Sequence, residues 1–446
     1  MSARSVSAPR DAGGTRFLLF PQPPFLPGFE DGEVVEVSPP AGTVGPGPSD
    51  DRMYAVYPVD KRLTYGTRIG PRGEKYRPPW RGPAYPPALP GPGGHFDHLE
   101  PGTPEFEQAH LYGAARFVLD VWEGYFGERI DWHFGGLYER MELVIMPRFN
   151  NATMGYGFLE IGGYRLTDGA YWPFSLNFDV IGHEIGHSII YPIVGLPHPR
   201  ILHQDYYGFH EAAADLVGLI ASLHFDSVIG RVMEQTRGNL YALNELNRFG
   251  ELTGHHQIRI ASNTASLIDF VRGWEDEHDL GQPLTGAVFD ILVDVFHEFM
   301  VERGVIGMHV EELSDALEED PDYHRVMQGL FDDAYAQDPV GMTEALLEAR
   351  DIVGLCLAAA FRMLTPDLSY RDVGEALLAA EEQVTGGKWH GIVWENLARR
   401  GIFHVPVGPR LKPPDEDSHM VSPRTEVPMA PTGRRGRGWH RRRMGA

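Results

Sequence analysis

The chain has 446 residues, more than one hydrophobic core usually supports, so we expect two or more lobes. Its 42% hydrophobic and 23% charged residues are typical of a soluble globular protein. The formal net charge is -23, and because the segment 404–446 holds nine Lys/Arg and four Asp/Glu (+5), the rest carries -28. An acidic body argues against nucleic acid and against an anionic membrane as the main partner.

The only cysteine, Cys356, excludes an intramolecular disulfide, and its apolar surroundings "IVGLCLAAAF" indicate a buried structural thiol. That run is too short to cross a bilayer. The start, "MSARSVSAPRDAGGTRFLLF", has no sustained apolar core followed by a small-residue cleavage site. We therefore expect a cytoplasmic location, with leaderless export left open.

The first half of the chain is predicted to be mixed in structure. Residues 1–96 are rich in proline and glycine with short strand-like pieces, which indicates an irregular segment that wraps a folded lobe. Residues 97–191 form a mixed lobe. In this lobe a helix is predicted to begin near Thr103 and to continue through "FEQAHLYGAARFVLDVWEGYF". Two later segments are typical of strands at a sheet edge, "MELVIMPRF" and "GYGFLEIGGY".

The second half is predicted to be a helical lobe over 192–403. Residues 404–446 are proline-rich and then arginine-rich, which predicts a disordered, solvated tail rather than a nucleic-acid arm. Helical periodicity predicts helices over 178–191, 208–224, 285–303, 341–364, 370–384 and 389–400.

The stretch "FDVIGHEIGHSII" contains His183, Glu184 and His187 in the pattern H-E-x-x-H. On a helix, the two histidines project from one face and can bind one metal ion. Glu184 lies about 100° round from His183, where a carboxylate can reach a metal-bound water without being a ligand. Pro192 is predicted to end this helix. The pentapeptide alone is a weak signal, and an amphipathic helix with two incidental histidines fits it equally well.

A third ligand decides whether the motif is a metal site. A histidine ligand of the H-E-x-x-H-x-x-G-x-x-H type is excluded, because Ile190 and Ile193 occupy the positions that this pattern needs. The candidates further along the chain are His198, His203, Asp205, His210 and Glu211.

Glu211 is the strongest of these candidates. It opens "EAAADLVGLIASL", a good helix former in which Glu211 and Asp215 lie on one face. A carboxylate would complete a His₂Glu site with an open fourth position, the arrangement of a catalytic zinc. Asp215 could then accept the second ring N–H of a ligand histidine.

These segments resemble the thermolysin-like metallopeptidases, the gluzincin class. The similarity lies in "DVIGHEIGH", the Gly-Leu pair at 195 and 196, and "GFHEAAADLVG". It extends to "EQAHLYGAARFVLD", "NNATMGYGFLEIGG", "LTPDLSYRDVGEALLAAEEQVTG" and "WENLARRGI" and so covers roughly 105–402. The resemblance implies an α+β, two-lobe fold with a β-rich N-terminal lobe, a helical C-terminal lobe and the zinc helix at the floor of the cleft between them.

The resemblance also implies roles for individual residues. His183, His187 and Glu211 would be zinc ligands, Glu184 the general base, and Asp215 the partner of a ligand histidine. Asn151 and the backbone of Ala152 would bind an extended substrate by strand addition.

Arg259, in "IRIASN", is similar to the arginine that grips the substrate carbonyl, and His278 to the histidine that donates to the oxyanion. Here the Thr-Gly pair follows His278 by seven residues, whereas the family has His-x-x-Ser-Gly. His255 and His256 therefore remain alternatives for that histidine, and either Tyr206 or Tyr207 could supply a phenolic donor.

The implied activity is zinc-dependent hydrolysis of a peptide or protein substrate, most consistent with an endopeptidase. One alternative is a zinc-stabilised scaffold that binds a peptide or a partner without cutting it. An aminopeptidase is a weaker alternative, because no Gly-x-Met-Glu-Asn precedes the motif. Calcium is left open, because Asp179 matches one calcium ligand of the family but Ser222 stands where a glutamate is expected. The oligomeric state and the cleavage preference do not follow from the sequence.

Overall fold

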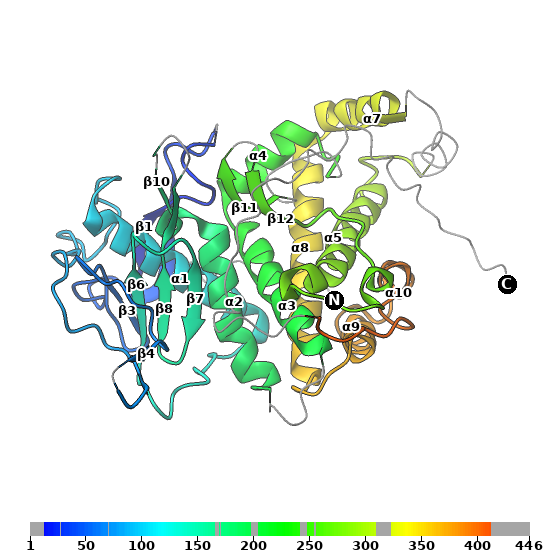
Figure 1. Cartoon of the computed structure of the whole chain (residues 1–446). Helices are drawn as coiled ribbons and strands as arrows, with labels where there is room; N and C mark the ends of the chain where they lie inside the picture. Colours follow the sequence, from blue (N-terminus) through cyan, green and yellow to red (C-terminus); the bar gives the residue numbers. More distant parts are fainter. Residues whose placement is uncertain are drawn as a thin grey trace.

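The structure is a computed structural model, and its fold is α+β. It describes residues 13–26, 28–69, 71–165, 169, 171–197, 204–240, 248–253, 256–308 and 323–411. The four-stranded sheet and the N-terminal segment lie on one side of the molecule and most helices on the other, with α2 (Phe178–Val194) between them (Figure 1). A mixed N-terminal lobe followed by a helical lobe is the arrangement expected from the sequence.

The main sheet combines the N-terminal segment with the central part of the chain. Its strand order is β3-β6-β8-β7, with β3 (Met53–Val56), β6 (Met141–Ile145) and β8 (Phe158–Ile161) parallel and β7 (Ala152–Gly155) antiparallel at one edge. The segment 1–96 therefore supplies a strand of this sheet and does more than wrap it. Of the strands expected at an edge, β6 and β8 are internal, because β3 and β7 flank them.

The remaining strands form two-stranded pairs. All are antiparallel: β1 (Gly14–Leu19) with β2 (Glu33–Pro40), β4 (Arg68–Ile69) with β5 (Glu74–Lys75), β9 (Gly163–Arg165) with β10 (Tyr171–Pro173), and β11 (Arg248–Thr253) with β12 (His256–Ile260).

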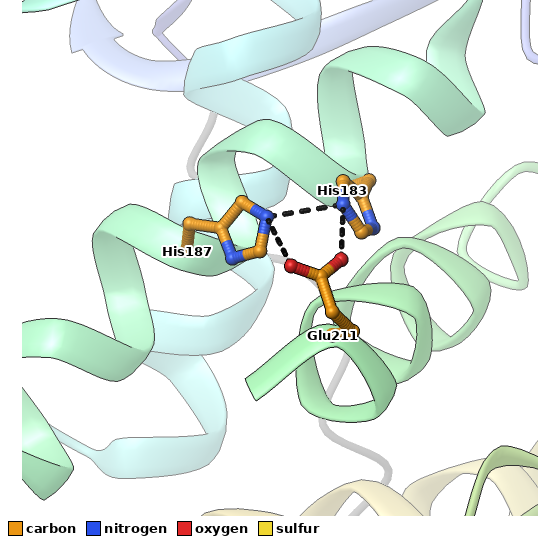
Figure 2. Close-up of side chains that lie close together, drawn as sticks. All are labelled: His183, His187 and Glu211. Atoms are coloured by element: carbon orange, nitrogen blue, oxygen red, sulfur yellow. Dashed lines mark hydrogen bonds and ion pairs between the residues drawn. The ribbon is translucent and has the colours of Figure 1, made fainter. Parts of the chain in front are cut away.

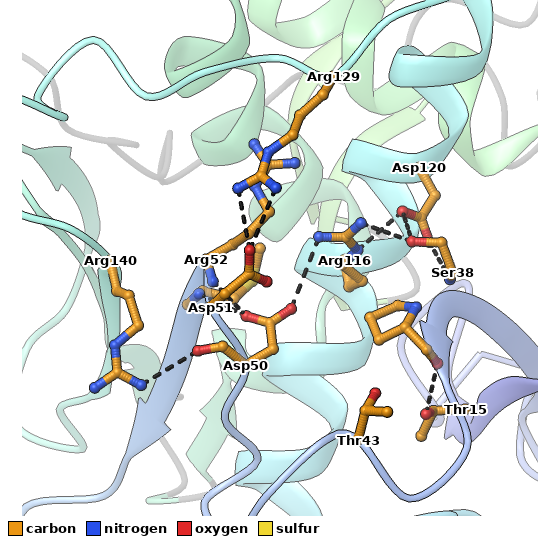
Figure 3. A network of polar contacts seen from close by, with 12 residues as sticks. Thr15, Ser38, Thr43, Asp50, Asp51, Arg52, Arg116, Asp120, Arg129 and Arg140 are labelled. Atoms are coloured by element: carbon orange, nitrogen blue, oxygen red, sulfur yellow. Dashed lines mark hydrogen bonds and ion pairs between the residues drawn. The ribbon is translucent and has the colours of Figure 1, made fainter.

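Helix α1 (Pro104–Phe126) is almost entirely buried and links the two sides of the molecule. The predicted start is confirmed, since the Thr103 side chain accepts from Phe106 N–H and so satisfies one of the free N–H groups of the first turn. A polar network ties α1 to the N-terminal segment (Figure 3). In it, Arg116 pairs with Asp120 at 2.9 Å, and Asp120 accepts from both the backbone N–H and the hydroxyl of Ser38 at 2.7 Å.

Apart from the β11–β12 pair, the described part of the C-terminal half is mainly helical. The predicted helices are present, and α4 and α7 occur in addition to them. Most boundaries of the predicted helices lie within three residues of the prediction, and the start of α5 differs by eight. Helix α2 continues through Pro192 to Val194 and ends at Gly195, whose φ of 106° suits glycine. Helix α5 begins at Glu277, well before the predicted residue 285. The helices that follow α2 are α3 (Asp205–Ser222), α4 (Asp226–Thr236), α5 (Glu277–Glu302), α7 (Tyr323–Gln337), α8 (Pro339–Met363), α9 (Tyr370–Thr385) and α10 (His390–Arg399), and short 3-10 turns lie at Phe174–Leu176 and Leu267–Phe270.

The prediction of a disordered tail from 404 is wrong for its first residues. Gly408 N–H donates to Phe270 O at 2.9 Å and Leu411 N–H to Trp274 O at 2.7 Å, so this segment runs beside 270–274. Arg410 also pairs with Glu277 at 2.9 Å. Residues 412–446 lie outside the described part of the chain.

Cys356 is buried, as expected, and burial raises the pKa of its thiol to about 12. Within the described ranges no single helix is long and apolar enough to cross a membrane. Helices α3 and α4 pass that test only as a pair bent by 91°, by length and composition alone.

Candidate metal centre

The candidate centre depends on the close packing of α2 against α3. A Cβ atom added to Gly182 would lie 2.9 Å from Gly218 Cα, and one added to Gly186 would lie 2.8 Å from Ala214 Cα. Such distances leave no room for a side chain on α2 at these positions. The glycine inside His183-Glu-Ile-Gly-His187 therefore lets the two helix backbones approach and brings the histidines of α2 to the carboxylate of α3.

His183, His187 and Glu211 converge on one point, as Figure 2 shows. His183 Nε2 lies 3.0 Å from His187 Nε2 and 3.3 Å from Glu211 Oε2, and His187 Nε2 lies 3.8 Å from Glu211 Oε1. Tetrahedral zinc with bonds of 2.0–2.2 Å separates its donors by about 3.3–3.6 Å. The three observed separations bracket that range, so these residues fit a zinc ion with a fourth position open.

The charges around Glu211 favour its ionised form. Burial alone would raise its pKa, but His278, His187 and His183 together hold the pKa well below its ordinary value. An ionised carboxylate beside two imidazole nitrogens is the donor set of a hard to borderline divalent cation.

Each ligand-position histidine has a second partner behind it. Asp215 Oδ1 lies 2.7 Å from His183 Nδ1, the position that the sequence suggested for it. His187 Nδ1 instead lies 2.9 Å from His210 Nδ1. Sequence reasoning considered His210 as a possible ligand and missed this role. The sequence feature that could have indicated this role is the position of His210 directly before Glu211 on the same helix.

Glu184 and His278 both belong to the same region. Glu184 is fully buried on α2, next to His183 in the chain. His278 Nε2 lies 3.2 Å from Glu211 Oε2. Asp276 fixes His278 twice, because its carboxylate accepts from the backbone N–H of His278 at 2.9 Å and lies 2.8 Å from ring Nδ1. Asp276 was also missed, although an aspartate before a helical run is a recognised N-cap signal.

Asn151 and Ala152 lie at the start of β7, the edge strand on the side of α2 (Figure 1). Asn151 is buried, and its side-chain oxygen accepts from Ala152 N–H at 2.9 Å. That N–H is therefore engaged within the chain. The rest of β7 pairs only with β8 among the described strands and so presents an edge for strand addition.

Several other candidates lie apart from the centre or outside the described residues. The side chains of Arg259 and His256 lie outside the described part, although both backbones belong to β12. His198, His203 and His255 are outside it altogether. Tyr206 is buried, and its hydroxyl donates to Gly195 O at 2.9 Å, at the end of α2. Tyr207 packs against Trp274.

Asp179, the residue that matches a calcium ligand of the family, has a protein partner. Asp179 is buried, and Gln22 Nε2 lies 3.3 and 3.4 Å from its two carboxylate oxygens. Ser222 donates to Leu219 O at 2.8 Å. Asp179 belongs to none of the groups of His, Cys, Asp and Glu that could hold a metal ion among the described residues; those groups are the candidate centre and Glu381, Glu382 and His390.

Comparison with known proteins leaves the family open. No family model matches the sequence, and no curated protein matches it. Among solved structures, the precursor of protealysin, a metalloproteinase from Serratia proteamaculans, has 11% identity and a TM-score of 0.46, and the match covers 82% of this chain and 90% of that chain. At that identity and score the likeness carries no argument about this chain, and its chemistry has to be judged from its own residues.

Proposed function

We propose that this protein is a zinc-dependent metallopeptidase, most consistent with an endopeptidase. The observation that carries the proposal is the convergence of two imidazoles and one carboxylate at separations that fit tetrahedral zinc. His183, His187 and Glu211 would hold the ion. When bound, zinc in such a site supplies Lewis acidity and a water whose pKa is about 7.

The residues around the ion have the chemistry that amide hydrolysis needs. Glu184 would accept a proton from the attacking water and deliver it to the leaving amine nitrogen. His278, held by Asp276, would donate to the oxygen that becomes negative as water attacks the carbonyl. Its exposed fraction of 13% leaves it accessible beside the buried ligands.

The substrate would be an extended peptide or protein segment. The open edge of β7 would pair with its backbone, and Asn151 would shape the start of that edge. We assign Arg259 a substrate-carbonyl contact only on the strength of the sequence resemblance.

A peptidase assay with two variants tests the proposal. The full chain is loaded with one equivalent of zinc and incubated with an unfolded protein substrate, with and without a chelator. Cleavage by wild type, loss with chelator and a drop in kcat for Glu184→Gln with zinc still bound are expected. Asp279→Asn is the matched control. It also converts an acidic side chain to its amide, but it leaves the zinc ligands, Glu184 and His278 unchanged.

The alternative of a zinc-bound scaffold without activity predicts a different pattern. Wild type and Glu184→Gln would then be equally inactive on several substrates while both retain zinc. That result would remove the peptidase proposal and leave the metal centre standing.

A further inference from the structure

The end of α9 and the start of α10 bring three potential metal ligands together. Glu381 and Glu382 come from α9, His390 is the first residue of α10, and one donor atom of each lies within 4.8 Å of the others. The two helices pack against each other in the helical part of the molecule (Figure 1). None of these residues belongs to the candidate centre between α2 and α3, so this α9–α10 cluster is a separate group.

Glu381 is the buried member of the cluster, with a side chain only 1% exposed. Its Oε1 accepts from Trp389 N–H at 2.8 Å and from the Thr385 hydroxyl. Its Oε2 is also buried but has no hydrogen-bond donor among the described residues. The same side chain borders a cavity whose other lining residues are uncharged, Cys356 and Val393 among them. A buried carboxylate oxygen without a donor is costly, so Oε2 is an atom that a cation would stabilise.

The distance from Glu381 to His390 fits a shared ion better than a direct bond. Glu381 Oε2 lies 3.9 Å from His390 Nδ1. An N–H···O hydrogen bond extends to only about 3.2 Å. Two donors that bind one ion at 2.0–2.2 Å are about 2.8–4.4 Å apart, depending on the angle between them. The observed separation is therefore too long for a hydrogen bond and within the range for two ligands of one ion.

A glycine in the loop between the helices makes room for the third ligand. A Cβ atom added to Gly387 would lie 2.5 Å from Glu382 Oε2, and the φ of Gly387 is 83°. Glycine is therefore the residue that lets the Glu382 carboxylate lie against this loop. Glu382 and His390 are exposed, so a side-chain movement of roughly half an ångström brings all three donors within the range of one ion.

The local charge also favours a cation at the cluster. The last turn of α9 contains no basic residue, although the C-terminal end of a helix carries a partial negative charge that a cation stabilises. Lys388 is close in the chain, but its ammonium pairs with Glu302 on α5 at 2.8 Å. The two carboxylates and the helix end therefore act together on any ion that His390 helps to hold.

We propose that Glu381, Glu382 and His390 bind a divalent metal ion of the zinc class, which ties the end of α9 to the start of α10. One imidazole nitrogen and two carboxylate oxygens are donors that zinc accepts. The buried carboxylate fixes the position of the ion, and the two exposed ligands close on it from the solvent side. This second metal site does not depend on the proposed peptidase activity.

Zinc binding by the full chain tests the proposal without any catalytic assay. Free zinc is set by a chromogenic chelator, and the zinc bound by each chain is counted. Wild type is expected to bind two equivalents, and His183→Ala and His390→Ala one each. Loss of a group that only orients a ligand typically costs 10–100-fold in affinity, so Glu382→Gln should weaken one equivalent at least about tenfold. Zinc should also raise the thermal unfolding midpoint of His183→Ala, but not that of the double variant with His390→Ala.

Two matched variants control for changes that leave the cluster intact. His404→Ala removes another exposed histidine, and Glu375→Gln neutralises another exposed glutamate of α9, one that pairs with Arg371 at 2.8 Å. Both should bind zinc like the wild type. Thermal unfolding in chelator shows whether each variant is folded, and if His390→Ala is not, Glu382→Gln decides.

The outcomes separate this site from the candidate centre. Zinc binding that is lost in His183→Ala and unchanged in folded His390→Ala and Glu382→Gln overturns the inference and leaves the candidate centre standing. One equivalent that depends on His390 alone supports the inference and overturns the candidate centre. An equal loss in His404→Ala and His390→Ala would show non-specific binding to exposed histidines and would overturn the inference.

Discussion

Replacing Gly186 by alanine should separate α2 from α3 and weaken zinc binding. The added Cβ would lie 2.8 Å from Ala214 Cα and 3.0 Å from Ala214 O, both backbone atoms that cannot turn aside. Ordinary carbon–carbon contacts are about 3.5–4.0 Å, so the helices must move apart by up to about 1 Å. Such overpacking typically costs about 1–3 kcal/mol, which exceeds the roughly 1 kcal/mol that alanine gains over glycine in a helix.

The same displacement acts directly on the ligand set. His187 Nε2 and Glu211 Oε1 are already 3.8 Å apart, at the long end for donors on one zinc ion. A further 1 Å would take Glu211 out of reach of an ion held by the two histidines. We therefore expect Gly186→Ala to lose at least tenfold in zinc affinity, about 1.4 kcal/mol, in addition to its loss of stability.

Zinc competition with a chromogenic chelator and urea unfolding with and without zinc measure the two effects. Gly230→Ala on α4 is the matched control, because Gly230 is helical and exposed and an added Cβ there meets nothing within 4 Å. It should gain up to about 1 kcal/mol from helix propensity and leave zinc affinity unchanged. If Gly186→Ala behaves like this control, close helix packing does not set the ligand geometry.

Three further predictions concern stability, measured by urea unfolding across pH. Lys61→Met should cost about 3–5 kcal/mol at pH 8, because it leaves buried Glu160 without the ammonium 2.6 Å away. Burial raises the pKa of Glu160 to about 7 even with Lys61 present, so Glu160 becomes neutral towards pH 5 and no longer needs the ammonium. The cost of Lys61→Met should therefore shrink towards pH 5, and a cost independent of pH would contradict this explanation. Burial lowers the pKa of His110 to about 4, whereas in the unfolded chain its pKa is about 6.5. As pH falls from 6.5 to 4, the unfolded chain therefore binds a proton that the folded chain does not. The free energy of unfolding should fall over that range by up to about 1.4 kcal/mol per pH unit. His110→Asn should reduce that slope, and an unchanged slope would remove His110 as its cause. Arg410→Ala should cost about 1–3 kcal/mol by leaving Glu277 buried without its guanidinium, and no loss would show that residues 404–411 do not stabilise the fold.

The local parts of the fold and site could be predicted because their signals are close together in the chain. Thr103 before an apolar helical run marks a helix start whatever lies around it. The two histidines of one helical face, and the glutamate and aspartate of another, are likewise each encoded within a few residues. Hydrophobic periodicity then gives the helices on which those faces lie.

The parts that could not be predicted depend on distant residues. No local signal shows that Met53–Val56 pairs with Met141–Ile145, because the pairing partners lie almost ninety positions apart. The segment 404–411 was assigned to a disordered tail on its prolines, whereas its order comes from backbone bonds to 270–274. Composition describes a segment but not the surface against which it packs.

The early start of α5 explains why the spacing of the sequence alone does not select His278 over His255 and His256. Gly281 and Pro283 are helix breakers by propensity, so the pattern placed the start of the helix after them. In the structure α5 nevertheless includes Pro283 in its second turn, and it begins at Glu277 because the Asp276 side chain caps that end by accepting from His278 N–H. The cap that begins the helix at Glu277 is also the carboxylate that orients the His278 ring towards Glu211. A helix starting at 285 would leave His278 in a loop, so the position of this side chain follows from one N-cap rather than from spacing to a downstream Thr-Gly pair.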